Sequence, residues 1–235
     1  SVKYTSDNLE SFIGIPKYKR TQRDNAAECG VVSGLAWTSV GGEMLEVEAV
    51  ALEGTGKLEL TGNLGDVMKE SVRAALTYLR SRREKFGLAP DFYSKNDIHI
   101  HFPEGAVPKD GPSAGITTAT ALISAFTGMP VPKSIAMTGE ISIRGCVLPI
   151  GGLKEKTMAA YREGVTTVII PAENKPDLKD IDPVVREGLN FVFASNMDEV
   201  AAVVFGDMLN QSAGDKKSAS AHLSQDHAPA KRIRQ

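Results

Sequence analysis

The sequence lacks the features that mark several large classes of protein. Its 235 residues include 27 basic and 29 acidic side chains, so no surplus of positive charge favours nucleic acid or an anionic membrane surface as a partner. The longest apolar stretches, such as residues 200–205, are far too short to cross a bilayer, and the N-terminus has no charged-then-apolar export pattern. We therefore expect a soluble, cytoplasmic protein that contacts no membrane, and DNA binding is not indicated.

Cysteine is scarce, which argues against both a zinc site and a secreted disulfide framework. Cys29 and Cys146 stand far apart and lack the spacing of metal ligands. We expect buried free thiols in a reducing compartment and no metal site. The rest of the composition, with 42% hydrophobic and 24% charged residues, is that of an ordinary globular protein.

A complete phosphate-binding loop is also missing. Residues 54–57 resemble the end of such a loop, but the motif requires glycine where Ala51 stands and a hydroxyl side chain where Leu58 stands. The segment is better interpreted as a hairpin turn. We therefore expect no nucleotide or other cofactor in this chain.

The hydrophobic pattern that the sequence does contain changes near residue 62 from the alternation of strands to the period of a helix. Residues 30–61 alternate β-branched and aromatic residues with glycine turns, which predicts a meander of three short strands. A helical pattern then begins at Asp66 and is expected to end at Gly87, with one apolar face formed by Met68, Val72, Ala75 and Leu79. The basic run over residues 80–85 is interpreted as a solvated helix face rather than a nucleic-acid patch.

Strands and helices alternate further along the chain. The pattern predicts strands over 97–102, 134–138 and 166–170, helices over 113–124 and 153–163, and a final strand and helix across 191–205. Residues 103–112 and 149–152 are predicted loops rich in proline and glycine. The order indicates an α+β (mixed α/β) fold. Apolar residues thin out after residue 212, and we expect 207–235 to be a disordered polar tail.

One serine stands in a setting that suits a nucleophile. Residues 111–115 fit the G-x-S-x-G pattern around Ser113, which is a weak signal alone. An α/β-hydrolase would also need a downstream histidine, and the only later ones, His222 and His227, lie in the polar tail. His99 and His101 share a face of a predicted strand and could lie near the serine, although such pairs are more often structural.

A lysine is the other candidate base. The helix that follows residues 149–152 needs an inward face, which the spacing assigns to Leu153, Thr157 and Ala160. Lys156 lies beside that face, whereas Lys154 should point to solvent. At an ordinary pKa of about 10.4 only about 0.04% of a lysine amine is neutral at pH 7, but desolvation would make it a usable base. The residues alone leave open whether Lys156 is a catalyst or only buries its aliphatic stem while its amine reaches solvent.

Three longer motifs in the sequence resemble those of a known protein family. Residues 103–115, 137–140 and 148–156 closely resemble the proteolytic domain of Lon, the ATP-dependent serine protease of bacteria and organelles. The similarity extends over about residues 30–205 and includes the segments 34–37 and 171–175. The resemblance implies the Lon protease-domain fold over residues 30–206.

The resemblance also implies roles for individual residues. Ser113 matches the nucleophile and Lys156 the general base of a Ser-Lys dyad, Thr138 matches a residue that hydrogen-bonds the lysine, and Asp110 matches an acidic residue that can shape or occlude the site. The backbone around the helix start, at Pro112, Ser113 and Ala114, is the candidate oxyanion site.

The implied activity is that of a serine endopeptidase that hydrolyses unfolded or damaged proteins through an acyl-enzyme. In the family an AAA+ ATPase module, which binds ATP and magnesium, precedes this domain in a hexamer that serves protein quality control and the stress response. We therefore expect the chain, which starts at Ser1, to be part of a larger polypeptide, with 1–29 as the junction after the ATPase.

Two alternatives to the peptidase stay open. The first is a Lon-like oligomerisation or nucleic-acid scaffold without activity, and the second is a serine esterase. Ser113 and Lys156 together argue against the scaffold, since a scaffold needs neither side chain.

Overall fold

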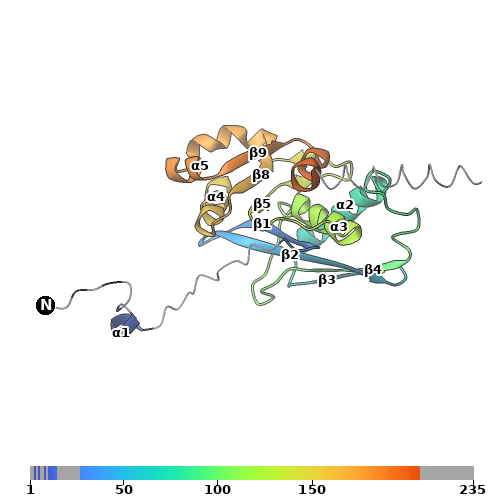
Figure 1. Cartoon of the computed structure of the whole chain (residues 1–235), viewed down its shortest axis with the longest axis horizontal. Coiled ribbons are helices and arrows are strands. Elements are labelled where there is room, and N and C mark those ends of the chain that lie inside the picture. The colour runs from blue at the N-terminus through green and yellow to red at the C-terminus, as the bar shows by residue number, and fades with distance from the viewer. Residues whose placement is uncertain (1–2, 4, 6–7, 9, 15–26, 207–235) are drawn as a thin grey trace, which may run out of the picture.

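A seven-stranded mixed sheet forms the centre of the computed structural model, with helices on both faces (Figure 1). The structure describes residues 3, 5, 8, 10–14 and 27–206. The expected tail, 207–235, and most of the expected junction, 1–29, lie outside these residues. The strand order is β3-β4-β2-β1-β5-β8-β9. This arrangement confirms the predicted mixed α/β class.

The first strands form a hairpin rather than a three-stranded meander. Strands β1 (Val31–Thr38) and β2 (Gly41–Glu53) pair antiparallel as expected. Strand β4 (Asn96–His101), however, lies between β2 and β3 (Leu58–Thr61) and pairs parallel with β3. The prediction that the third strand continues the meander is therefore wrong, because β3 pairs with β4 and not with β2. The short β3 suits the edge of the sheet, whereas β4, with Ile98 and Ile100 buried, suits an interior position.

Helix α2 (Asp66–Ser81) buries the predicted apolar face. It ends at Ser81 rather than Gly87, because the N–H of Arg82 closes the last turn on the carbonyls of Tyr78 and Leu79. The chain then runs through turns to Gly87, which has a positive φ of 66°. Arg80, Arg82 and Lys85 are exposed and Arg83 is half-buried, so the basic run is largely solvated as expected, but only Arg80 belongs to the helix.

The remaining elements follow the expected alternation, with additions. Helix α3 (Gly115–Thr127), strand β5 (Ile135–Met137), helix α4 (Leu153–Arg162), and strands β8 (Thr167–Pro171) and β9 (Asn190–Ala194) agree closely with prediction, and residues 197–206 are helical. The patterns missed the small hairpin β6 (Glu140–Ile141) and β7 (Val147–Leu148), the 3-10 helix η1 (Ala172–Asp180) and the short helices α1 (Glu10–Ile13) and α5 (Pro183–Gly188).

Two cores lie on opposite faces of the sheet. One is formed by α2 and α3 against the inward side chains of β2 and β4, such as Val47 and Ile100. The other is formed by α4 and α5 against Ala136, Val168 and Ile170 of β5 and β8. Helices α3 and α4 therefore start on different sides of the same sheet. None of the helices among the described residues is both long and apolar enough for a membrane span.

A glycine at the start of β2 sets how closely α4 approaches the sheet. A Cβ at Gly42 would lie 1.9 Å from the carbonyl oxygen of Glu155 and 2.9 Å from the backbone nitrogen of Lys156. Gly42→Ala should therefore push the first turn of α4 outward and lower the free energy of unfolding by about 1–3 kcal/mol, as overpacking does. Urea unfolding measures this change. Gly105→Ala is the control, since a Cβ there meets nothing within 4 Å, and equal effects of the two variants would contradict the prediction.

Candidate active site

The predicted site residues come together where β5 ends. Strand β5 pairs with β1 only at Ser33 and Gly34, and the chain leaves the sheet after Met137. The starts of α3 and α4, from opposite faces, lie close to this point, which Thr138 occupies: its hydroxyl bonds to Ser113, just before α3, and to Lys156, in the first turn of α4. Three segments far apart in the sequence thus meet through one hydroxyl group.

A cavity of about 620 Å³ opens at this junction. Ser113, Lys156 and Asp110 all line it. Its other walls come from the end of β1, the start of β2, the loop between β4 and α3, and the glycine turn before α4. The residues that line these walls include Trp37, Met44, Val107, Ile150 and Gly152. The size is that of a ligand-binding cleft.

Ser113 is held by its backbone while its side chain stays free to react. Its carbonyl accepts hydrogen bonds from the Gly139 N–H at 2.9 Å and from Thr138 Oγ1 at 3.3 Å. The hydroxyl of Ser113 is partly buried at the cavity wall and has no hydrogen-bond partner within the described part of the chain. The rigid backbone therefore presents an available oxygen.

The start of α3 also offers backbone donors. The N–H groups of Gly115 and Ile116 are bonded to the carbonyls of Pro112 and Gly139. By contrast, no acceptor among residues 27–206 binds the N–H groups of Ser113 and Ala114. Pro112 has no N–H, so of the three predicted oxyanion residues only Ser113 and Ala114 can donate, and Pro112 contributes its carbonyl to the turn.

Lys156 is buried, as its place beside the inward helix face predicts. It is 2% exposed, and its Nζ donates to Thr138 Oγ1 at 3.1 Å, whereas Lys154 is exposed. Burial lowers the pKa of Lys156 to about 8 because the charged amine loses its water. No carboxylate of the described chain forms an ion pair with it, so no opposite charge offsets this desolvation. About a tenth of the amine is therefore neutral at pH 7.

Ser113 and Lys156 share the cavity but are connected through Thr138. No hydrogen bond joins Ser113 Oγ to Lys156 Nζ in the part of the chain that the structure describes. Thr138 is fully buried, accepts from the lysine and donates to the serine carbonyl. Catalytic hydrogen bonds are often long without substrate and tighten when it binds. The arrangement therefore suits a dyad that closes on a substrate.

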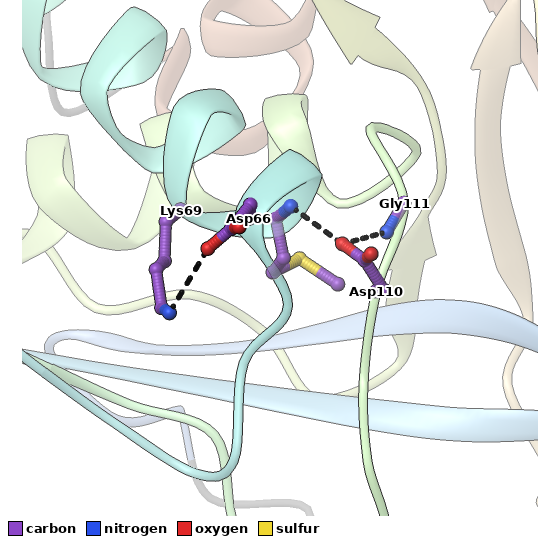
Figure 2. A network of polar contacts seen from close by, with 5 residues as sticks. Asp66, Lys69, Asp110 and Gly111 are labelled. Carbon is purple, nitrogen blue, oxygen red and sulfur yellow. Dashed lines mark hydrogen bonds and ion pairs between the residues drawn. The ribbon is translucent and has the colours of Figure 1, made fainter.

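Asp110 anchors the loop that carries the serine. Its Oδ1 accepts from the Met68 N–H at 2.9 Å and from the Gly111 N–H at 2.8 Å (Figure 2). The carboxylate thereby caps the N-terminus of α2, where Gly65 offers no side chain for the purpose. It makes no hydrogen bond to Ser113 Oγ or Lys156 Nζ among the described residues. In this structure Asp110 shapes the loop rather than blocking the lysine.

The histidine alternative is wrong, because the two rings lie elsewhere. His99 Nε2 and His101 Nδ1 both bond to Thr61 Oγ1, at 2.8 and 2.7 Å, and neither residue lines the cavity. The paired histidines are structural. No group of three or more potential metal ligands occurs among the described residues. Cys29 and Cys146 are free but exposed, which corrects the expectation that they are buried.

The comparison with known families agrees with this geometry. The model of the Lon protease (S16) C-terminal proteolytic domain matches residues 3–207. The chain belongs to this family. The chain is 56% identical to Lon protease 1 of Bacillus subtilis (strain 168) over 85% of this chain and 26% of that protein. It is 55% identical to Lon protease of Brevibacillus choshinensis over 92% of this chain and 27% of that protein. The chain therefore spans about a quarter of the length of the curated relatives that it matches.

Sequence reasoning on this Lon proteolytic domain missed one residue that contacts the site's framework. Asn174 appeared only inside the motif 171–175, with no role assigned. In the structure it is 4% exposed and bonds to both backbone groups of Ile150 in the cavity wall. A polar side chain between a strand and a proline gave no periodic signal. Only its membership of the Lon motif marked it.

Proposed function

We propose that this Lon proteolytic domain is a serine endopeptidase that uses a Ser113-Lys156 dyad and an acyl-enzyme intermediate. The observation that carries the proposal is a lysine that is 2% exposed, lacks an ion-pair partner among the described residues, and shares one cavity with a serine at a helix start. A scaffold gains nothing from a buried, unpaired lysine, which costs free energy.

The proposed mechanism assigns each group one task. Neutral Lys156 accepts the proton of Ser113 Oγ, and the oxygen attacks the peptide carbonyl. The N–H groups of Ser113 and Ala114, which have no acceptor among the described residues and lie at the positive end of α3, stabilise the oxyanion. Protonated Lys156 then gives its proton to the leaving amine, and water hydrolyses the acyl-enzyme. Thr138 keeps the amine oriented between these steps.

The end of β1 is suited to hold an extended peptide. Thr38 and Gly41 flank a two-residue turn, and pairs along an antiparallel ladder alternate between bonded and non-bonded. The N–H and C=O of Trp37 therefore point away from β2, toward the side on which β5 has already ended. Its side chain is 60% exposed and lines the cavity. We propose that substrate adds a strand here, which requires an unfolded chain but little specific sequence.

The pH dependence of hydrolysis tests the base. Since only neutral Lys156 accepts a proton, kcat/KM should rise with pH and level off above a midpoint of about 8. At pH 6 it should be about 100-fold below the plateau, a factor of ten for each unit below the pKa. A peptide assay between pH 5.5 and 9.5 measures the profile. Lys154→Ala should keep the same midpoint, and a midpoint near 6.5 would indicate a histidine base instead.

The activity of the whole protein is a further part of the proposal. We propose that the domain acts in the cytoplasm on unfolded or damaged proteins, in protein quality control and the stress response, within a homo-hexamer whose AAA+ module binds ATP and magnesium. Folded domains resist unfolding by about 5–15 kcal/mol, which hydrolysis at this site does not supply. The present chain should therefore cleave short or unfolded peptides but not stably folded proteins.

One assay separates the peptidase from its rivals. The chain is incubated with casein, a short peptide and an ester, with and without ATP and magnesium, at several protein concentrations. Peptide cleavage without a response to ATP supports the proposal, and specific activity that rises with concentration supports an assembly requirement. A serine-directed fluorophosphonate that fails to label Ser113, together with intact casein, would favour the silent scaffold.

A further inference from the structure

We propose that Asn174 is a positioning residue that holds the turn before α4 and thereby places Lys156 relative to Ser113. The inference rests on the proposed function for its kinetic consequence. Asn174 lies in η1 and does not line the cavity, so it acts through other residues rather than on substrate.

The contacts of Asn174 are directed at a single residue of the cavity wall. Its Oδ1 accepts from the Ile150 N–H at 3.0 Å, and its Nδ2 donates to the Ile150 carbonyl at 2.9 Å. The second hydrogen of Nδ2 is donated to Asp177 Oδ2 at 2.7 Å, which fixes the orientation of the amide. The side chain therefore pairs with Ile150 as a neighbouring strand would.

The turn that Asn174 holds leads directly to the lysine. Ile150, Gly151 and Gly152 line the cavity, and the Gly152 carbonyl accepts the Lys156 N–H at 3.0 Å in the first turn of α4. Gly152 has a positive φ of 69° and packs so closely on Trp37 that a Cβ would lie 2.9 Å from that side chain. The turn is thus clamped between β1 on one side and Asn174 on the other.

The chemistry of the clamp requires an amide. An aspartate at position 174 would keep the acceptor for the Ile150 N–H but would turn a second oxygen toward the Ile150 carbonyl and stand beside the carboxylate of Asp177. An aliphatic side chain at this buried position would leave the N–H and C=O of Ile150 without their partner. Without the clamp, the turn can shift and water can reach Lys156.

The test compares Asn174→Ala with Asn190→Ala, which removes an exposed amide at the start of β9. A displacement near 1 Å costs on the order of 100-fold in rate, so we expect Asn174→Ala to lower kcat by 10- to 100-fold, with a smaller change in KM. Active-site titration with a fluorophosphonate should still count one reactive serine per folded chain. The midpoint of the pH profile should move upward, because a more hydrated amine is more easily protonated. Asn190→Ala should behave as wild type.

Two further measurements keep the outcome decisive. Nitrogen-15 NMR titration measures the pKa of the Lys156 amine, and therefore its degree of burial, without any catalysis. A higher pKa in Asn174→Ala than in wild type supports the inference even if the wild-type chain hydrolyses nothing. Absence of hydrolysis by the wild type would refute only the proposed function. If Asn174→Ala does not fold, Asp177→Ala, which removes only the bond that orients the amide, should change kcat and the midpoint in the same directions. A folded variant at either position with wild-type kcat and midpoint overturns the inference.

Discussion

Replacing Ser113 with alanine should lower kcat/KM for peptide hydrolysis by on the order of 10⁴-fold or more, because loss of a nucleophile removes the covalent route entirely. The free energy of unfolding should change by less than about 1 kcal/mol. The hydroxyl makes no hydrogen bond in the described part of the chain, and the loop is held by the Ser113 carbonyl, which alanine retains. Peptide turnover and urea unfolding of the same preparation measure both effects.

A matched serine separates chemistry from structure. Ser71 Oγ donates to the Pro112 carbonyl at 3.2 Å and so supports the same loop from α2. Ser71→Ala should keep most of the activity and lose some stability, which is the reverse of Ser113→Ala. Hydrolysis near the wild-type rate by Ser113→Ala would remove the serine from the mechanism.

Replacing Lys156 should abolish hydrolysis and, for one substitution, stabilise the fold. Lys156→Arg and Lys156→Met should both be inactive, since guanidinium stays protonated and methionine has no base. The charged lysine is costly inside the protein: its pKa of about 8 lies below the unfolded value of about 10.4, a difference worth about 3 kcal/mol. With the Thr138 hydrogen bond lost, Lys156→Met should raise the free energy of unfolding at pH 7 by about 2 kcal/mol.

The size of this stabilisation depends on pH, because the folded and unfolded chains lose the lysine proton at different pH values. Below pH 8 the amine is charged in both states and the full desolvation cost is present in wild type. Between pH 8 and about 10.4 the unfolded chain binds the proton and the folded chain does not, so wild-type stability rises relative to that of Lys156→Met. Urea unfolding at pH 7 and pH 10 measures the difference. If the difference in free energy of unfolding between wild type and Lys156→Met is as large at pH 10 as at pH 7, the lysine is not desolvated.

Periodicity predicted the parts of the fold that depend on burial within one element. The apolar face of α2 and the inward position of Lys156 follow from helical spacing, and both are confirmed. Pairing between distant elements left no such trace. Nothing in residues 58–61 states that their partner is a strand some forty positions away rather than the neighbouring β2. The end of α2 was predicted too late. The basic residues after Ser81 have a composition typical of a helix, although their backbone is not helical.

The site itself was predictable only in part from chemistry. Helical spacing placed Lys156 near the interior, and a short glycine motif marked Ser113, but the choice between lysine and the two histidines required the resemblance of three longer motifs. The residues that support the proposed dyad were harder to predict. Asp110 caps a helix 42 residues away, and Asn174 bonds a turn 24 residues away, both through contacts that no local pattern encodes.

The cap that Asp110 provides gives the loop of Ser113 a spectroscopic reporter. The Met68 amide is bonded to the Asp110 carboxylate instead of to a residue of its own helix. Its proton is protected from exchange with solvent deuterium only while the serine loop rests on α2. The exchange rate of this one amide, compared with that of the next turn of α2, therefore reports how often the loop lifts away, at a backbone group to which the proposed mechanism gives no task.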